Sequence, residues 1–330
     1  MTPDVARGDM ADAIAPFAAV IARDEFREAL ERVCLARWGC RPVSEPRVTP
    51  LRAHRRRCTF EIELPTERCG QHVIAKAYAH DRSDVFRYMQ VLAHDGFGPD
   101  TECSIPQPFE HLSSLRVRLE ERVPGPSVKD IITTGSADDW TAAAERCGHW
   151  LGRFHSEAPR PGNPADVPGE LSRARQAGAR MSDTGEQLAR KARALLGALE
   201  AAAPAAGAGV PCAGHGSFMP DHVIVRGRRT AVIDLDEYDV ADPARDVAWF
   251  LVSLRRRAIQ LLGARYALDG AAVAFVQAYV AACPKDALNH LPFFQALECM
   301  HRARRDLYKQ STPRPEWAEF MLDEGLRALP

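Results

Sequence analysis

Hydrophobic residues in the first part of the chain follow a helical and then a strand-like period. They recur at helical spacing over residues 11–38, and Gly39 and Pro42 are expected to end this helix. Residues 59–64 read TFEIEL and alternate apolar with polar side chains, which is the period of a half-buried strand. The pattern therefore predicts an N-terminal helix followed by strands. The apolar positions of the helix are Ile14, Phe17, Val20, Ile21, Phe26, Leu30, Val33 and Trp38.

The same two periods return between residues 72 and 125. HVIAKAYA (72–79) predicts another strand, and LRVRLEERVPG (115–125) alternates again before it breaks at its Pro-Gly pair. Residues 82–96 lie between them and predict a helix with one apolar side. That side is formed by Val85, Tyr88, Met89 and Leu92. The order of helix, strands, helix and strands predicts a small sheet with one helix packed on it.

After residue 125 the pattern becomes mainly helical. Residues 141–158 and most of 169–203 have helical periodicity, and the segment 243–328 is helical again. Two short strands, HVIV (222–225) and TAVIDLD (230–236), flank a turn-like RGRR. The chain is therefore expected to be an α+β protein with a small strand-rich lobe and a larger helical lobe.

Composition excludes several classes of protein. The chain has 330 residues, of which 46% are hydrophobic and 26% charged, and this is typical of a globular protein with a buried core. Its net charge of -1 gives no basic footprint for nucleic acid. Nine cysteines without a CxxC pair favour a reducing compartment. No apolar run reaches the ~20 residues of a membrane span, and MTPDVARGDM is unlike a signal peptide. We expect a cytoplasmic protein without nucleic-acid or membrane partners.

Polar residues gather around the two short strands of the second half. AGHGSFMPDHVIV (213–225) precedes DLDEYDVADP (234–243), and Asp234 ends the apolar strand AVID. Asp236 follows two residues later, so both carboxylates face the same side if the chain stays extended. Two oxygen donors on one face suit Mg²⁺, which binds one or two carboxylates and keeps several waters. An acidic, solvated turn at the end of a strand would give the same pattern.

Four segments together resemble the aminoglycoside phosphotransferase/choline kinase-like family, whose members have the protein-kinase-like fold. They read VIAKAY, LEERVPG, HGSFMPDHVIV and VIDLDEYDVADPARDVAWFL, and they occur in the family's order and spacing over residues 45–255. The resemblance implies an N-terminal helical extension (1–43), a nucleotide-binding lobe with a small antiparallel sheet (44–122) and a mainly helical lobe (123–330). The helical lobe would carry the catalytic loop and the acceptor site.

The activity that this resemblance implies is an ATP-dependent phosphotransferase reaction on a small hydroxyl-bearing compound, with Mg²⁺ or Mn²⁺ as the metal. Lys76 would reach the nucleotide phosphates, and the backbone of EERV (120–123), with Glu121 and Val123, would hold the adenine. The family's helix usually offers a glutamate to this lysine. No glutamate occurs between residues 76 and 101, and Asp84 is the nearest acid on the predicted helix.

The second half of the resemblance implies a metal site and a catalytic loop. Asp234 would bind the metal with Asp236 assisting, and Asp246 would brace the loop from the following helix. Ser217 stands where the family has its catalytic aspartate, and a serine hydroxyl is not a general base near neutral pH. His215 and Asp221 are the other candidate catalytic residues of this loop.

Two further departures change the expected ligands. His222 stands where the family has a metal-binding asparagine, and its imidazole would suit manganese or zinc better than magnesium. The first hairpin lacks glycines and reads RAHRRR (52–57), so Arg55, Arg56 or Arg57 would have to contact phosphates as charged donors. A solvated basic turn explains this hairpin equally well.

Three functions stay open at this point: a phosphotransferase, a pseudokinase that binds a nucleotide or protein without turnover, and nucleotidyl transfer on the same fold. The remaining polar residues are interpreted structurally. His149 and His155 lie six apart on a helix and are expected to pack or cap. The arginine runs 255–257 and 301–309 are expected to be solvated faces, and the cysteines buried thiols. If the second run lines the acceptor pocket, it argues against a polycationic acceptor, although Glu316, Glu319, Asp323 and Glu324 would supply acids.

Overall fold

The computed structural model describes residues 17–54, 56–67, 70–160, 162–181, 183, 185–205, 209–283, 285–308 and 312–329. The chain divides into two compact units, Met1–Pro124 and Gly125–Pro330, which we call the N-terminal and the C-terminal unit. Each unit is described by itself below. None of the helices in the described residues is both long and apolar enough to cross a membrane.

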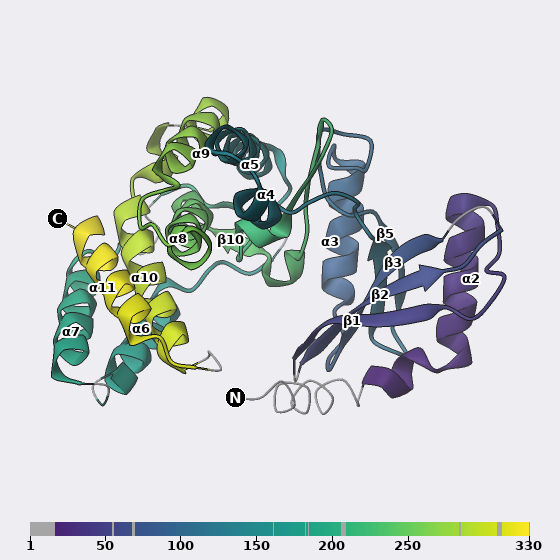
Figure 1. Ribbon diagram of the computed structural model, residues 1–330, viewed down its shortest axis with the longest axis horizontal. Helices are drawn as coiled ribbons and strands as arrows, with labels where there is room; N and C mark the ends of the chain where they lie inside the picture. Colours follow the sequence, from purple (N-terminus) through teal and green to yellow (C-terminus); the bar gives the residue numbers. More distant parts are fainter. Residues whose placement is uncertain are drawn as a thin grey trace. The chain divides into compact units, whose positions relative to one another are not determined.

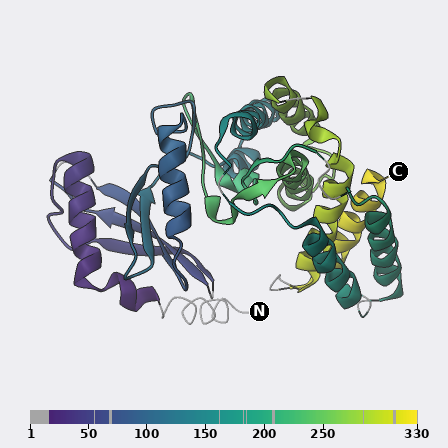
Figure 2. The ribbon, with the colours of Figure 1, turned by 180° about the vertical axis from the view of Figure 1, so that it is seen from behind.

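An antiparallel sheet with the strand order β1-β2-β3-β6-β5 forms the centre of the N-terminal unit. Figures 1 and 2 show this sheet between the helices α2 (Asp24–Trp38) and α3 (Ser83–His94). The prediction of a single helix on the sheet is therefore wrong. The strands are β1 (Arg47–His54), β2 (Arg57–Leu64), β3 (Gln71–Tyr78), β5 (Pro108–Leu112) and β6 (Val117–Glu121), and β4 (Cys103–Ser104) is a further short strand.

The first predicted helix is interrupted. Residues 17–21 are helical, but α2 begins only at Asp24 because Arg23 has an extended backbone. Asp24 and Glu25 then lie in the first turn, where the helix dipole favours negative charge. Gly39 ends the helix in a left-handed conformation with φ 65°, as its position in the sequence predicted. The predicted positions 11–16 lie outside the described residues.

The two faces of the sheet have different chemistry. Apolar side chains of α2 pack on one face with Phe60, Ile62, Val73 and Leu119 of the strands. Successive residues of a strand point to opposite faces, so Lys76, Arg118 and Glu120 project from the other face. The four apolar positions predicted for residues 82–96 are all buried in α3. Strand β5 was not predicted, because PFEHL has no polar-apolar alternation.

The C-terminal unit contains long helices and two short antiparallel strand pairs. Strands β8 (Val223–Arg226) and β9 (Arg229–Val232) form the predicted hairpin, and β7 (Cys212–Gly214) pairs with β10 (Asp239–Ala241). Helical segments occupy the predicted positions 141–158, 169–203 and 243–328, and three further ones, at 128–134, 220–222 and 235–237, were not predicted. Together they are α4 (Val128–Thr134), α5 (Ala137–Glu157), α6 (Val167–Met181), α7 (Glu186–Ala201), α8 (Pro243–Leu262), α9 (Asp269–Ala282), α10 (Leu291–Tyr308), α11 (Pro315–Ala328) and the 3₁₀ turns η1 (Pro220–His222), η2 (Leu235–Glu237) and η3 (Lys285–Leu288).

Two groups of helices pack within this unit. Helices α6, α7, α10 and α11 lie side by side in both views and share one apolar core with α8 (Figures 1 and 2). Helices α5 and α9 form the other close pair. Their backbones approach closely at Gly148, where an added Cβ would lie 2.2 Å from the Phe275 carbonyl oxygen. Glycine is needed here by space, although it weakens a helix by itself.

We expect Gly148→Ala to lower the free energy of unfolding by about 1–3 kcal/mol, because the new methyl group forces α5 and α9 apart. Gly197→Ala is the matched control, since an added Cβ at this exposed position in α7 meets no atom within 4 Å. The control is expected to raise stability by about 0.5–1 kcal/mol through helix propensity. Denaturant unfolding of the full chain measures both values, and equal effects of the two substitutions would contradict the close approach.

Candidate functional site

A buried carboxylate holds the start of the loop that follows β7. Asp246 of α8 accepts hydrogen bonds from the backbone N–H groups of His215 at 2.6 Å and Gly216 at 3.0 Å. This is the bracing contact expected of Asp246. An aspartate that satisfies two buried donors fixes the path of the loop, because leaving those N–H groups unpaired costs free energy.

His155 of α5 completes this network. Its Nε2 lies 3.4 Å from Oδ2 of Asp246, and its Nδ1 lies 2.9 Å from the Tyr279 hydroxyl of α9. Burial by itself raises the pKa of Asp246. The hydrogen bond of His155 and the charge of Arg245 lower this pKa by more than burial raises it, so it lies well below its usual value. The interpretation of His155 as a packing or capping residue missed this contact. It joins residues 91 positions apart, so helical spacing carried no signal for it.

Close packing explains why the loop has glycine at position 216 and how His215 is held beside it. Gly216 has φ 77°, and an added Cβ would lie 2.1 Å from the carbonyl oxygen of Glu237 in η2. Only glycine fits this conformation and this close approach. His215 is fully buried, and its Nε2 lies 3.1 Å from the carbonyl oxygen of Ile233. Its imidazole therefore ties the loop to the end of β9.

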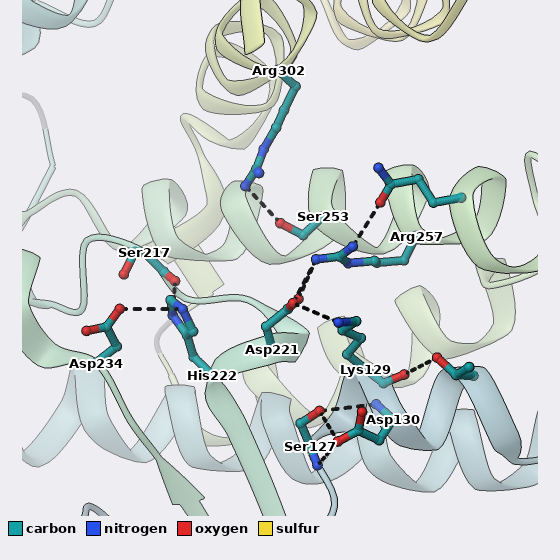
Figure 3. Close-up of polar contacts among 12 residues, drawn as sticks. Ser127, Lys129, Asp130, Ser217, Asp221, His222, Asp234, Ser253, Arg257 and Arg302 are labelled. Carbon is teal, nitrogen blue, oxygen red and sulfur yellow. Dashed lines mark hydrogen bonds and ion pairs between the residues drawn. The ribbon is translucent and has the colours of Figure 1, made fainter. Parts of the chain in front are cut away.

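His222 links the two ends of the candidate site. Its Nδ1 lies 2.9 Å from the carbonyl oxygen of Ser217, and its Nε2 lies 3.6 Å from Oδ2 of Asp234. Figure 3 shows the imidazole between these two residues. The Ile233 N–H also donates to the His222 carbonyl oxygen at 2.9 Å, next to the paired residues Val223 and Val232. The register of the hairpin thus sets the spacing between His222 and Asp234.

The chain does not stay extended at Asp234. Strand β9 ends at Val232, and Asp234 has a left-handed backbone with φ 68° and ψ 51° before the 3₁₀ turn η2. The expectation that Asp234 and Asp236 share one face of an extended strand is therefore wrong. Asp236 is 4% exposed, whereas Asp234 is partly exposed. A left-handed aspartate is a costly conformation that often marks a functional position.

Asp221 is engaged by cations from two helices. Both of its carboxylate oxygens lie 2.8 Å from Nη2 of Arg257, and Nζ of Lys129 lies 3.9 Å from Oδ1 (Figure 3). The ion pair fixes η1 between α4 and α8. Ser217 is half-buried in the same loop. Of the three candidate catalytic residues, His215 and Asp221 therefore make structural contacts through their side chains.

The arginine runs are not solvated faces. Arg255 pairs with Asp269 at 2.5 Å, and Arg256 pairs with the fully buried Asp306 of α10. Arg302 is buried and donates to Glu298 at 2.5 Å and to Ser253 at 3.1 Å. Acids on other helices bind Arg255 and Arg256, and an acid of the same helix binds Arg302. The prediction that the cysteines are buried thiols is confirmed for six of those in the described residues, which are Cys34, Cys58, Cys103, Cys147, Cys212 and Cys299. Cys40 and Cys283 are partly buried.

Lys76 of β3 has a carboxylate partner on a neighbouring strand. The lysine is 5% exposed, and its Nζ lies 3.6 Å from Oε1 of Glu120 in β6. The other oxygen of Glu120 accepts from Nε of Arg118 at 2.8 Å. Asp84 contacts Arg82 at 3.1 Å. The partner of Lys76 was expected on the helix, so Glu120 was not predicted. Its position diagonal to Lys76 nevertheless follows from the pairing of Lys76 with Arg118.

The other predicted nucleotide contacts lie on the same unit. The Glu121 N–H donates to Gln107 at 2.9 Å, and the Glu121 carboxylate accepts from the Gln107 N–H at 3.0 Å. Val123 is buried, and its carbonyl oxygen accepts from Arg122 at 3.2 Å. Arg56 lies exposed at the turn between β1 and β2, and Arg55 lies outside the described residues.

The donor atoms of the C-terminal unit suit a metal that also binds other ligands. Within the described ranges, no group of three or more His, Cys, Asp or Glu side chains is arranged to hold a metal ion. His222 and Asp234 offer one nitrogen and one oxygen donor. A metal ion bound by this pair would take its remaining ligands from water and from a phosphate-bearing molecule, as Mg²⁺ does in nucleotide sites.

Part of the chain matches a known protein family. Residues 71–282 match the family described as "Phosphotransferase enzyme family". A search of the curated proteins found no match.

Several solved structures are similar to the chain. One is a glucosamine kinase in complex with glucosamine, ADP and inorganic phosphate, with a TM-score of 0.65, 17% identity, and coverage of 93% of this chain and 86% of that one. A thermostable mutant of the aminoglycoside phosphotransferase APH(4)-Ia, in apo form, gives 0.59 at 14% identity over 90% and 98%. A choline/ethanolamine kinase family protein from Mesorhizobium loti gives 0.58 at 13% identity over 97% and 94%. These similarities confirm the predicted α+β, protein-kinase-like fold.

We expect Asp246→Asn to lower the free energy of unfolding by roughly 3 kcal/mol at pH 7, because it removes the charge that accepts the buried hydrogen bonds. Below about pH 3.9 the unfolded chain takes up a proton at this residue while the folded chain does not, so the advantage of wild type shrinks as the pH falls. Denaturant unfolding from pH 7 to pH 3 measures the difference. Asp138→Asn, at an exposed position of α5, is the control. A constant difference across this range would contradict the lowered pKa.

Proposed function

The chain belongs to the phosphotransferase enzyme family, and we propose from this that it transfers a phosphoryl group from ATP to a hydroxyl group of a small compound. The observation that carries the proposal is the loop 215–222, which Asp246 fixes at its start and Arg257 at its end. Phosphoryl transfer depends mainly on positioning and on electrostatic stabilisation of the transferred group. A loop held by buried charges supplies the positioning.

The proposed roles follow from the chemistry of each side chain. Asp234 binds the metal, with His222 beside it, and a bound divalent ion would neutralise charge on the phosphates. Asp236 is buried behind this position, and we assign it to support of the turn. Lys76 is held by Glu120, which suits a lysine that contacts nucleotide phosphates. Glu121 and Val123 supply the backbone against which an adenine would bind.

Ser217 is the candidate catalytic residue that lacks the chemistry of a general base. General-base catalysis contributes about 10²–10⁴-fold where it operates, and a neutral hydroxyl does not supply it. The transition state of phosphoryl transfer is largely dissociative, so a well-placed acceptor can react without a strong base. We assign Ser217 to hydrogen bonding of the acceptor hydroxyl.

A second candidate function is a pseudokinase that binds nucleotide without turnover. It is supported by the contacts of Asp221, since both of its oxygens accept from Arg257 and are thereby withdrawn from proton transfer. His215 is likewise committed to the Ile233 carbonyl oxygen. The two functions differ in whether any rate depends on Ser217.

We expect the purified full chain to transfer labelled phosphate from ATP to members of a panel of hydroxyl metabolites in the presence of Mg²⁺ or Mn²⁺. Asp234→Ala is expected to lower the rate by about 100-fold or more, because it removes a charge that organises the phosphates. Asp138→Ala, an exposed carboxylate of the same unit, serves as the control and is expected to keep the rate. The proposal fails if no acceptor is phosphorylated and Asp234→Ala behaves as wild type in every assay.

Substitutions at Ser217 separate the two functions. We expect Ser217→Ala to raise the KM for the acceptor and to lower kcat by about tenfold, because a hydrogen bond worth about 1.5 kcal/mol is lost. Ser217→Asp is expected to raise kcat, since a carboxylate supplies the missing base. Nucleotide-dependent thermal stabilisation with no transfer in all three proteins would support the pseudokinase instead. Release of AMP-labelled product would indicate nucleotidyl transfer.

A further inference from the structure

The imidazole of His222 is held in one orientation by the backbone. A carbonyl oxygen only accepts hydrogen bonds, so the contact of 2.9 Å with the Ser217 carbonyl requires the proton on Nδ1. In the neutral imidazole Nε2 then carries the lone pair, and it is the atom directed at Asp234 (Figure 3). Histidines that bind metals almost always donate their other ring N–H in this way, which fixes the tautomer and the ring.

The separation between Nε2 and Asp234 Oδ2 fits two donors that share one metal ion. It is 3.6 Å, longer than the range in which N–H···O hydrogen bonds are strong. Two donors that each lie about 2.1 Å from a metal are about 3.0 Å apart at a right angle and about 3.6 Å apart at 120°. The separation of 3.6 Å is therefore compatible with both atoms binding one ion.

The β8–β9 hairpin fixes the positions of His222 and Asp234 through the backbone. His222 directly precedes β8, and Asp234 lies two residues beyond β9, whose last residue Val232 pairs with Val223. The hydrogen bond from Ile233 to the His222 carbonyl oxygen continues the ladder up to the pair itself. His222 is buried, and the left-handed backbone of Asp234 turns the carboxylate out of the strand direction. This rigidity preorganises a nitrogen–oxygen donor pair.

We propose that His222 Nε2 and Asp234 together select a first-row transition-metal ion over Mg²⁺ as the divalent ion that accompanies the nucleotide. The inference rests on the proposed function, because the nucleotide phosphates provide further ligands. Mg²⁺ requires near-octahedral oxygen coordination and loses water reluctantly, whereas imidazole nitrogen is a ligand of the transition metals. An oxygen ligand at residue 222 would suit Mg²⁺, so the histidine changes the preference of the site.

Pulsed EPR of Mn²⁺ bound to the full chain with ADP tests this assignment. We expect modulation from a directly bound ¹⁴N nucleus, which changes to the ¹⁵N pattern when the protein alone is ¹⁵N-labelled. The label separates the imidazole from the nitrogens of adenine. His222→Asn is expected to bind Mn²⁺ and ADP without this modulation. His149→Asn is the matched control, because His149 is an exposed histidine of the same unit, and it is expected to keep the modulation.

A competition experiment measures the preference itself. Loss of a group that only orients a metal-bound histidine already costs about 10–100-fold in metal affinity, so loss of the ligand is expected to cost about tenfold at least. The ratio of Mg²⁺ to Mn²⁺ that displaces half of the bound Mn²⁺ should fall by that factor in His222→Asn. The wild-type EPR measurement needs no variant, so the test survives a variant that fails to fold.

The outcomes distinguish the inference from the function on which it rests. Bound Mn²⁺·ADP without ¹⁴N modulation from the protein, or with equal modulation in His222→Asn, overturns the assignment of His222 while nucleotide binding stands. An unchanged Mg²⁺/Mn²⁺ ratio in that variant overturns the claimed selectivity. If wild type changes neither the Mn²⁺ spectrum nor its own thermal stability with ADP in either metal, nucleotide binding fails and the metal assignment falls with it.

Discussion

The C-terminal unit depends on one buried negative charge. Asp246 lies in the first turn of α8, where the helix dipole favours a carboxylate, and its two oxygens accept from the loop backbone. The same helix is fixed at its start by Asp242, which caps the Ala244 N–H and contacts His290, the residue before α10, at 2.6 Å. Because His155 of α5 contacts this carboxylate and Tyr279 of α9 contacts His155, three helices converge on a loop of a few residues.

Backbone features fix the path of this loop. The backbone donors, Gly216 and the hairpin register determine the path of the chain, and none of them involves the side chain at 217 or 222. The His222 imidazole adds a further support through the Ser217 carbonyl oxygen, so Ser217 is the position whose side chain can change without changing this frame. In the proposed site, Ser217 offers a hydroxyl group and His222 a nitrogen donor.

Charge pairing has a comparable role in both units. Lys76 and Arg118 share Glu120 within the sheet, and Asp221 receives Arg257 and Lys129 beside the loop. Buried or half-buried ions remain charged only when partners replace the lost water. Lys76 and Glu120 lie on different strands, and Asp221 and its two cations lie on different helical segments, so these pairs also fix the spacing between elements. A solvent-exposed arginine run would have no such effect.

Local period and short motifs were enough to predict most of the elements, the family and the position of the loop and hairpin. Helical spacing located α3 and α5, alternation located β2, and the His-Gly and VIDLD segments located the loop and the hairpin. The break before α2, the irregular strand β5 and the turn at Asp234 were missed, because tertiary packing overrides local pattern at each of them.

Which side chains contact one another depends on the tertiary structure. His155 and Asp246, Lys76 and Glu120, and Arg257 and Asp221 are joined across 91, 44 and 36 positions of the chain. No periodicity reaches over such separations, and the register of a sheet or the crossing of two helices sets each contact. The orientation of His222 is the clearest case, since it follows from a backbone carbonyl whose direction exists only in the folded loop.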